Sequence, residues 1–498
     1  MFWSIVLPVM IYGINAISIF SLIFFRRRDM STTFAWLLVM IFLPVAGFVL
    51  YFFFGSTHKL EIMSKAYRMK DIEDHYMKVQ DFELNAIRND QMEFTDPVTE
   101  KYRDMIVMNS RNSGCLYTRN NKVELLVNGQ EKFPRMFEEI AAAKKTIHVL
   151  YFIIKTRDQI GKDFVDLLAK KAAEGVEVKV VYDGFGWLKT FRRDFRPIEE
   201  AGGKVQRFLP SHLRTILLVN YRLHRKMVVI DGKIAYTGGI NVGDDYLSLY
   251  PKMNPWRDTS VRVTGPAVQD LQLRFLEDWI FLEKQNKKLR DPLYKENIAA
   301  MNERYFPHLE GEEAQPGTAG VQIISCGPDS RYQTHKDSYI KIISSAKDYV
   351  YMQSPYFVPD ETLFETMRLA AQSGVDVRLM LPGIPDKKYV YYVALSYVQD
   401  LLDAGIRVYF HKGFVHAKTF VSDDHVSSVG TTNLDIRSFK LDYEVNTLVY
   451  DTEFALTCKD QYMRDIADSR EVCAEEWKQR GRWHYICESV CRFIAPLA

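Results

Sequence analysis

The chain has 498 residues, of which 47% are hydrophobic and 26% are charged, with 26 Gly and 18 Pro. This is an ordinary globular composition, and it excludes a disordered, a collagen-like or a disulfide-stapled chain. The 65 Lys and Arg residues nearly balance the 63 Asp and Glu residues, so the net charge indicates neither a nucleic-acid nor a membrane partner. Six scattered cysteines without a Cys-x-x-Cys pair provide no zinc-finger site, and we expect reduced thiols.

Residues 1–56 are the most apolar part of the chain. Residues Phe2–Phe25 and Met30–Gly55 contain no charged side chain, and Arg26–Asp29 separates the two stretches. A helix made of the first stretch would span about 36 Å, against about 30 Å of hydrocarbon. We therefore predict a two-helix transmembrane hairpin and a multi-pass protein of the cell membrane. A cleaved signal peptide is disfavoured because the arginines follow the apolar run, and a buried core hairpin is the other alternative.

Two later stretches of the chain repeat one order of elements. Each has an apolar strand, an amphipathic helix and a second apolar strand, at residues 147–152, 164–173 and 176–182, and again at residues 350–352, 363–371 and 375–381. A strand, a crossover helix and a second strand imply parallel pairing in a sheet that is covered by helices. The internal repeat therefore predicts an α/β fold with two similar lobes.

The domain limits follow from composition. A polar, charge-mixed connector is predicted over residues 57–114. An acidic segment with Gly and Pro, near Leu309–Gly320, makes a natural seam between the two copies. We therefore predict a first domain over residues 115–315 and a second over residues 316–498.

Each copy carries the same set of polar residues at the same spacing. The first set is His224, Lys226, Asp231 and Asn241, and the second is His416, Lys418, Asp423 and Asn433. Side chains at i and i+2 of a strand share one face, so we expect the His and Lys of each set to project together from a strand. Each Asp is expected to close the hairpin turn that follows. Imidazole acts as a nucleophile or proton carrier, and Lys and Asn donate to phosphate oxygens, so the set suits phosphoryl transfer.

The alternative for any single histidine is a structural role on a strand. Two sets with identical spacing inside an internal repeat favour the catalytic interpretation instead. His335, His411 and His425 have no counterpart in the first copy, and we interpret them as structural or supporting residues.

The paired pattern His-x-Lys-x-x-x-x-Asp, followed by Gly-Gly-x-Asn or Gly-Thr-x-Asn, resembles the phospholipase D superfamily over residues 115–498. The apolar N-terminal pair, Pro44, Trp256-Arg257-Asp258 and the stretch Ser354–Asp360 resemble the bacterial cardiolipin synthases within it. The resemblance implies two α/β lobes related by a pseudo-two-fold axis, with both motifs in one site. Both motifs are intact, so an active enzyme is expected.

The resemblance implies phosphatidyl transfer from one phosphatidylglycerol to another, which gives cardiolipin and glycerol. One histidine would attack phosphorus and the other would act as acid and then base, and the resemblance favours His224 as the nucleophile and His416 as the acid. No metal or other cofactor is expected, and no His-Glu-x-x-His motif is present. The phosphate oxygens would be held by Lys226, Lys418, Asn241 and Asn433.

The resemblance further implies a carboxylate that orients each histidine. Glu444 follows His416 and begins an apolar strand, and Asp258 occupies the similar place after His224. Asp231 and Asp423 would then support the motifs structurally.

Two other function classes stay open. One is a membrane-bound hydrolase of phospholipid or nucleic acid, and the other is a non-catalytic lipid-binding scaffold. No basic groove with interleaved aromatic residues favours nucleic acid. The sequence determines neither the oligomeric state nor whether phosphatidylethanolamine can replace one phosphatidylglycerol. The C-terminal segment, residues 475–498, mixes aromatic, apolar and Arg residues, which predicts either an interfacial amphipathic helix or a final helix packed on the second lobe.

Overall fold

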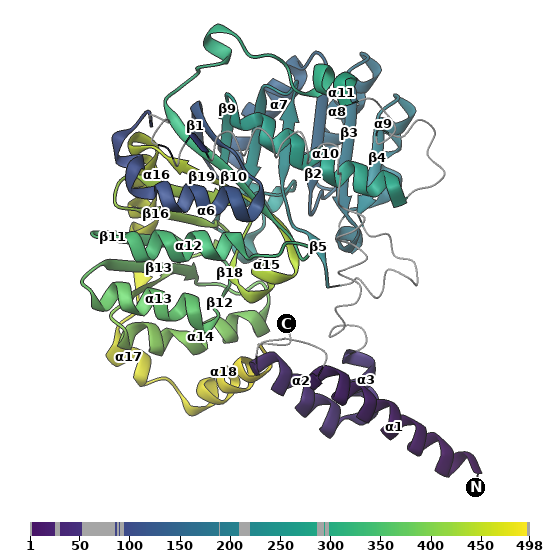
Figure 1. Ribbon diagram of the computed structural model, residues 1–498, viewed down its shortest axis with the longest axis vertical. Coiled ribbons are helices and arrows are strands. Elements are labelled where there is room, and N and C mark those ends of the chain that lie inside the picture. The colour runs from purple at the N-terminus through teal and green to yellow at the C-terminus, as the bar shows by residue number, and fades with distance from the viewer. Residues whose placement is uncertain are drawn as a thin grey trace.

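The computed structural model describes residues 2–24, 30–51, 85–86, 89, 94–188, 190–208, 220–285, 293 and 298–495. These residues form an α/β protein with two lobes and three N-terminal helices at one end (Figure 1). The predicted arginine turn at residues 26–29, and the part of the connector at residues 57–84, lie outside the described residues.

Within the described residues, sixteen strands form one continuous mixed sheet that runs through both lobes. At its centre, β1 (Tyr117–Val127) is antiparallel to β10 (Ala319–Cys326) through its first half. Its second half is antiparallel to β9 (Thr259–Thr264). One long strand therefore joins the lobes, because each of its halves is bonded to a strand of a different lobe.

The first lobe confirms the predicted strand, crossover helix and strand. Three of its strands are parallel, namely β2 (Thr146–Tyr151), β3 (Glu177–Asp183) and β4 (Lys204–Phe208). Helix α8 (Gln159–Ala173) connects β2 to β3. On the other side of β2 the order continues antiparallel through β6 (Met227–Ile230), β7 (Ile234–Gly238) and β9.

The second lobe repeats this arrangement, as the sequence repeat predicts. Its parallel strands are β11 (Tyr349–Gln353), β13 (Asp376–Pro382) and β14 (Arg407–His411). Helix α13 (Glu361–Gln372) is the crossover. The antiparallel part runs through β16 (Thr419–Ser422), β17 (Val426–Gly430), β19 (Asp442–Tyr450) and β10.

Helices cover both faces of the sheet, so its strands are apolar on both sides. Side chains alternate between the faces: Ile147 and Val149 of β2 lie in the first lobe's own core, whereas Leu150 lies in a core shared by both lobes. The shared core is covered by α10 (Ala267–Gln285) and α16 (Thr452–Ala467). The opposite face is covered by α7 (Asn128–Ala142) and α8 in the first lobe, and by α6 (Arg103–Ser113), α12 (Thr334–Ser345), α13 and α14 (Lys388–Asp403) in the second.

The N-terminal helices α1 (Phe2–Phe24), α2 (Met30–Phe42) and α3 (Pro44–Leu50) pack together. The Nδ2 of Asn15 in α1 donates to the carbonyl of Met40 in α2 at 2.8 Å. Counting only residues whose side chains are described, none of the helices has the length and apolarity to cross a membrane.

The second predicted span, Met30–Gly55, is not one helix. Helix α2 ends at Phe42 and α3 begins at Pro44, because proline lacks an amide proton and disfavours helical geometry in the residue before it. Helix α3 then folds back on α2. A Cβ at Gly47 would lie 2.5 Å from the carbonyl oxygen of Val39, so only glycine allows this approach.

Candidate active site

The two histidine motifs lie in the short links that precede β6 and β16, and not within strands as predicted. Residues 224–226 follow β5 (Arg222–Leu223), and residues 416–418 follow β15 (Phe414–Val415). Each lysine still lies beside its histidine, because its Nζ donates to the histidine carbonyl, at 2.6 Å in the first motif and 2.5 Å in the second.

The strand before each motif pairs with the other lobe, which is why the motif leaves its own sheet. Strand β5 is parallel to the start of β19, and the His224 amide donates to the carbonyl of Tyr443 at 2.9 Å. Strand β15 is parallel to β8 (Trp256–Arg257), and the His416 amide donates to the carbonyl of Arg257 at 2.7 Å. Each histidine therefore lies beside the residue that directly follows its backbone acceptor in the other lobe, which is Glu444 after Tyr443 and Asp258 after Arg257.

Those next residues are the two carboxylates. The Nδ1 of His224 is hydrogen-bonded to Oε1 of Glu444 at 2.8 Å, and the Nδ1 of His416 to Oδ2 of Asp258 at 2.7 Å. Sequence order had associated each acid with the histidine of its own copy, and the structure corrects this pairing. A repeat gives the place of an acid within its lobe but not its partner across the lobe boundary. Because each carboxylate contacts the histidine of the opposite lobe, each half of the site is incomplete without the other.

Burial and the neighbouring lysines lower the pKa of both imidazole rings. Burial, and then the charge of Lys226, holds the pKa of His224 well below its ordinary value. Lys418 and His416 lower the pKa of His224 further, so the two motifs lie close enough to interact. Burial and Lys418 lower the pKa of His416 to about 4, against the opposing charge of Asp258. With Nδ1 held by a carboxylate, the Nε2 of each ring is the nitrogen left for chemistry.

The two carboxyl groups differ in how readily they ionise. Burial opposes ionisation of Asp258, but its contact with His416 and the charge of Lys418 outweigh that effect and lower its pKa. Burial raises the pKa of Glu444 well above its ordinary value, with Lys226 opposing, and the Thr431 hydroxyl donates to this carboxyl group. Asp258 therefore supports a positive charge on His416 more strongly than Glu444 supports one on His224.

Both lysines of the motifs are buried close to their carboxylates. Burial lowers the pKa of Lys226 to about 7, against the charge of Glu444. It lowers the pKa of Lys418 to about 8, against the charge of Asp258. An anionic phosphate placed between these ammonium groups would raise both pKa values, so the lysines respond to a bound phosphodiester by becoming fully charged.

The two asparagines follow β7 and β17. The Oδ1 of Asn241 accepts the Ile153 amide at 3.2 Å, and its Nδ2 donates to the Tyr246 hydroxyl at 2.7 Å. In the second copy the Nδ2 of Asn433 donates to the Ser438 hydroxyl at 3.1 Å. In both copies the hydroxyl comes five residues after the asparagine. Sequence reasoning missed these hydroxyls, although their identical spacing was a usable signal.

Asp231 and Asp423 close the β6–β7 and β16–β17 turns, as predicted, with φ of 53° and 49°. Their carboxylates accept backbone amides at 2.7–3.0 Å, from residues 144–146 and 347–349 respectively. These bonds tie each turn to the start of β2 or β11. The two aspartates lie at the far ends of β6 and β16 from the histidines.

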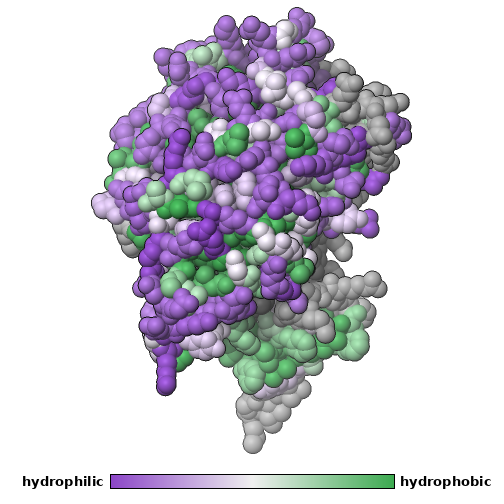
Figure 2. Space-filling view, turned by 90° about the vertical axis from the view of Figure 1, so that its left-hand side faces the viewer, coloured by the Kyte–Doolittle hydropathy of each residue, from purple (hydrophilic) through white to green (hydrophobic). Residues whose placement is uncertain are grey.

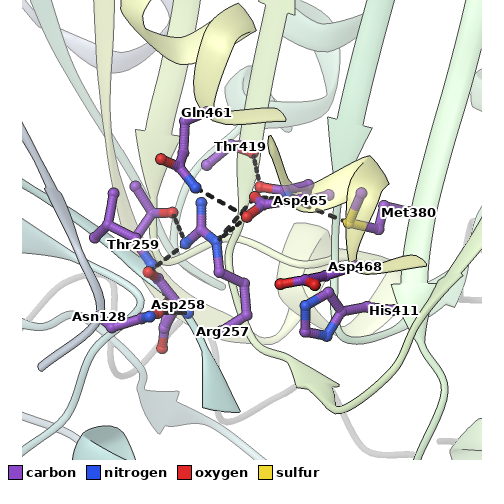
Figure 3. Close-up of polar contacts among 12 residues, drawn as sticks. Asn128, Arg257, Asp258, Thr259, Met380, His411, Thr419, Gln461, Asp465 and Asp468 are labelled. Atoms are coloured by element: carbon purple, nitrogen blue, oxygen red, sulfur yellow. Dashed lines mark hydrogen bonds and ion pairs between the residues drawn. The ribbon is translucent and has the colours of Figure 1, made fainter. Parts of the chain in front are cut away.

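Arg257 and Arg225, which sequence reasoning did not assign to the site, hold the segments that carry the acids. The Nε of Arg257 donates to both carboxylate oxygens of Asp465 in α16 at 2.8 Å, and its Nη1 donates to the carbonyl of Asp258 (Figure 3). Arg225 donates to Asp278 in α10 at 2.6 Å and to the carbonyl of Glu444 at 3.3 Å. Each arginine therefore links an acid-bearing segment to one of the helices over the shared core.

A cavity of about 430 Å³ adjoins His224. Its polar walls include Arg222, Lys387, Asn433 and Arg437, together with Asp435 and Asp442, whose pKa values burial raises. Its apolar walls include Phe152, Val358, Tyr389, Val390, Val393 and Ala495. This combination suits an amphiphilic ligand with a phosphate at one end. The described residues bring together no group of three His, Cys, Asp or Glu side chains that could hold a metal ion.

Comparison with known proteins gives two family matches. The family described as "Cardiolipin synthase, PLD-like domain" matches residues 136–279 and 339–466. The family described as "Phospholipase_D-nuclease N-terminal" matches residues 13–56.

The chain is also similar to individual proteins. It is 40% identical to the major cardiolipin synthase ClsA of Bacillus subtilis over 99% of both chains, and 40% identical to a cardiolipin synthase of Listeria welshimeri over 95% of both. A solved structure of phosphatidylserine synthase from Haemophilus influenzae has a TM-score of 0.56 and 16% identity, and the match covers 75% of this chain and 92% of that one. At this identity the structural likeness supports the two-lobed fold alone.

Proposed function

Because the chain belongs to the cardiolipin synthase family, we propose that it transfers the phosphatidyl group of one phosphatidylglycerol to another and so makes cardiolipin and glycerol. The observation that carries this proposal is the pair of crossed histidine–carboxylate contacts beside a cavity with polar and apolar walls. The reaction exchanges one phosphodiester for another, so it consumes no nucleotide.

In the first step, the Nε2 of His224 attacks the phosphorus of one phosphatidylglycerol. A phosphorus–nitrogen bond forms, the bond from phosphorus to the glycerol oxygen breaks, and His416 gives its proton to that oxygen. Two observations support this assignment. His224 lines the cavity, and its lowered pKa keeps the ring neutral, which suits a nucleophile. Burial and Lys418 lower the pKa of His416 to about 4, but the negative charge of the bound phosphodiester, added to that of Asp258, raises it again, so that His416 carries the proton when the step begins.

In the second step, the glycerol hydroxyl of another phosphatidylglycerol displaces His224 from phosphorus. His416, now neutral, takes the hydroxyl proton as the new phosphorus–oxygen bond forms and the phosphorus–nitrogen bond breaks. The enzyme returns to its starting protonation state, with cardiolipin and one glycerol as the products.

The lysines and asparagines of both motifs would hold the non-bridging phosphate oxygens. Their ammonium and amide hydrogens stabilise the extra negative charge of the five-coordinate phosphorus, in the manner of an oxyanion hole. The lowered pKa values of Lys226 and Lys418 support this role, because a bound phosphodiester is what would make both groups fully cationic. Asp231 and Asp423 would act only as structural supports.

The proposal includes an N-terminal membrane anchor over residues 1–56, followed by the connector and the two domains divided near residue 315. When its whole sequence is counted, helix α1 has 23 residues and no charged side chain, and its exposed side chains include Met10, Ile17 and Phe20. A helix of that length spans about 35 Å, against about 30 Å of hydrocarbon. The second limb would enter the membrane as the broken pair α2 and α3, which Pro44 divides. This anchor would make the enzyme a multi-pass protein of the cell membrane.

The direct test is to incubate the purified full-length protein with phosphatidylglycerol as the only lipid and no nucleotide. We expect cardiolipin and free glycerol in equal amounts. The runner-up function, hydrolysis, is supported by the same fold and motifs, and it would instead give mainly phosphatidic acid. A requirement for a cytidine nucleotide would overturn the proposed exchange, and binding of lipid without turnover would favour a scaffold. His224→Asn serves as the inactive control.

A further inference from the structure

The last helix of the chain, α18 (Arg482–Ile494), carries a stripe of large apolar side chains that faces away from the protein. Trp483, Ile486, Val490 and Phe493 are between 50% and 72% exposed. Their spacing of three, four and three residues places them on one side of the helix. The stripe is therefore a continuous surface and not a set of scattered side chains.

The opposite side of α18 is fixed against the second lobe. Arg492 donates to Asp400 of α14 at 2.8 Å, and its guanidinium lies 4.2 Å from the centre of the Tyr397 ring. Glu488 is buried and accepts from Arg480 at 2.5 Å. These contacts set the rotation of the helix, so the apolar stripe cannot turn inward without breaking them.

The location of the stripe favours a lipid bilayer over another protein surface as its partner. Figure 1 shows α18 at the same end of the molecule as the N-terminal helices, and Figure 2 shows hydrophobic residues gathered at that end. Trp483 and Tyr485 are exposed amphipathic rings of the kind that settle at the boundary between headgroups and acyl chains. The exposed Arg482 at the start of the helix would meet anionic headgroups such as those of phosphatidylglycerol.

The same helix leads to the catalytic cavity. Ala495, directly after α18, lines the cavity that adjoins His224. Tyr389, Val390 and Val393, from the helix on which α18 packs, line the same cavity. We propose that α18 lies in the bilayer interface as a second membrane contact, separate from the N-terminal anchor, and holds the cavity against the lipid surface so that phosphatidylglycerol can enter it. This role in lipid supply rests on the proposed function, whereas the membrane contact itself does not.

The contact is tested by fluorescence quenching on the full-length protein in phosphatidylglycerol vesicles whose acyl chains carry bromine, which quenches nearby tryptophan. We expect the wild-type protein to lose more fluorescence than Trp483→Phe does, because the substitution removes a quenched fluorophore. Trp477→Phe is the matched control, since Trp477 is buried in the protein and should contribute no quenched signal. Equal quenching of the wild-type protein and Trp483→Phe would overturn the proposal.

The role in lipid supply is tested with the double variant Ile486→Asp, Val490→Asp. We expect about a tenfold loss of cardiolipin formation on bilayer vesicles, because two apolar side chains no longer favour the interface. The rate with short-chain phosphatidylglycerol dispersed in detergent should stay unchanged, which shows that the variant folds. The matched control is Leu456→Asp, Met463→Asp, in which two similarly exposed apolar residues of α16 are changed.

Two outcomes of this second experiment would overturn the role in lipid supply. One is equal activity of the stripe variant and the α16 variant on vesicles. The other is a dimer in light scattering that the stripe substitutions dissociate, which would assign the surface to a second copy of the chain. If the wild-type protein formed no cardiolipin while Trp483 was still quenched, the proposed function would fail and the membrane contact would stand.

Discussion

The crossed pairing predicts that each acid serves the histidine of the opposite lobe. Asp258→Asn keeps the size of the side chain but removes the charge that lies 2.7 Å from Nδ1 of His416. Asp258 is fully buried, so solvent cannot replace the lost charge. Loss of a buried carboxylate that orients a catalytic histidine costs about 10⁴-fold in kcat in the Ser-His-Asp triad, which is about 5.5 kcal/mol. We expect Asp258→Asn to lower kcat by about 10³- to 10⁴-fold in this protein.

Asp258→Asn and Glu444→Gln should impair different steps of the reaction. Asp258→Asn impairs the acid and base, so a denaturing quench with radiolabelled lipid should still retain some label on His224, as in His416→Asn. Glu444→Gln impairs the nucleophile and should retain no label, as in His224→Asn. Unchanged thermal melting of both variants serves as the control. If Asp258→Asn matched His224→Asn and Glu444→Gln matched His416→Asn, each acid would serve the histidine of its own copy, contrary to the crossed pairing.

Three further predictions concern the lysines and Asp231. Lys226→Ala and Lys418→Ala should each cost on the order of 2 to 4 kcal/mol of transition-state stabilisation. The double variant should lose much less stabilisation than the sum of the two single losses, because both lysines act on one phosphate. A double-mutant cycle on initial rates measures this difference, and strict additivity of the losses would indicate two independent sites. Because burial lowers the pKa of Lys226 to about 7, the folded chain binds fewer protons than the unfolded chain between pH 7 and 10.5. The free energy of unfolding should therefore rise with pH in that window, and less so in Lys226→Met; denaturant titrations giving the same rise for both proteins would contradict this. Asp231→Ala leaves three backbone amides without their acceptor and should lower the free energy of unfolding by about 1 to 3 kcal/mol, with kcat of the folded protein unchanged. Loss of kcat at unchanged stability would show that Asp231 takes part in chemistry.

Much of the fold could be predicted because its signals are local. The strand, helix and strand of each lobe follow from short apolar patterns, and the repeat gives the second lobe once the first is recognised. The turns at Asp231 and Asp423 are also local, because Asp tolerates a positive φ beside another turn-forming residue. The break in the second N-terminal span had a local signal too, since Pro44 cannot continue the hydrogen bonding of a helix.

The contacts that complete the site could not be predicted in this way. His224 and Glu444 are 220 residues apart, and Arg257 and Asp465 are 208 residues apart. Both contacts depend on how the lobes meet, through β5 on β19 and β15 on β8, and two-residue strands leave almost no pattern in a sequence. The motif histidines were expected on strands for the same reason, because nothing local indicates that these residues leave their own sheet.

If the two lobes build one reaction centre, each chain should hold no more than one lipid covalently at a time. The wild-type protein is mixed with phosphatidylglycerol labelled at phosphorus, quenched in denaturant within the first turnover, and digested for peptide mapping. With one reaction centre, bound label should saturate at no more than one phosphatidyl group per chain, with all of it on the peptide that contains His224. Saturation at two groups per chain, with label on both His224 and His416, would contradict a single reaction centre.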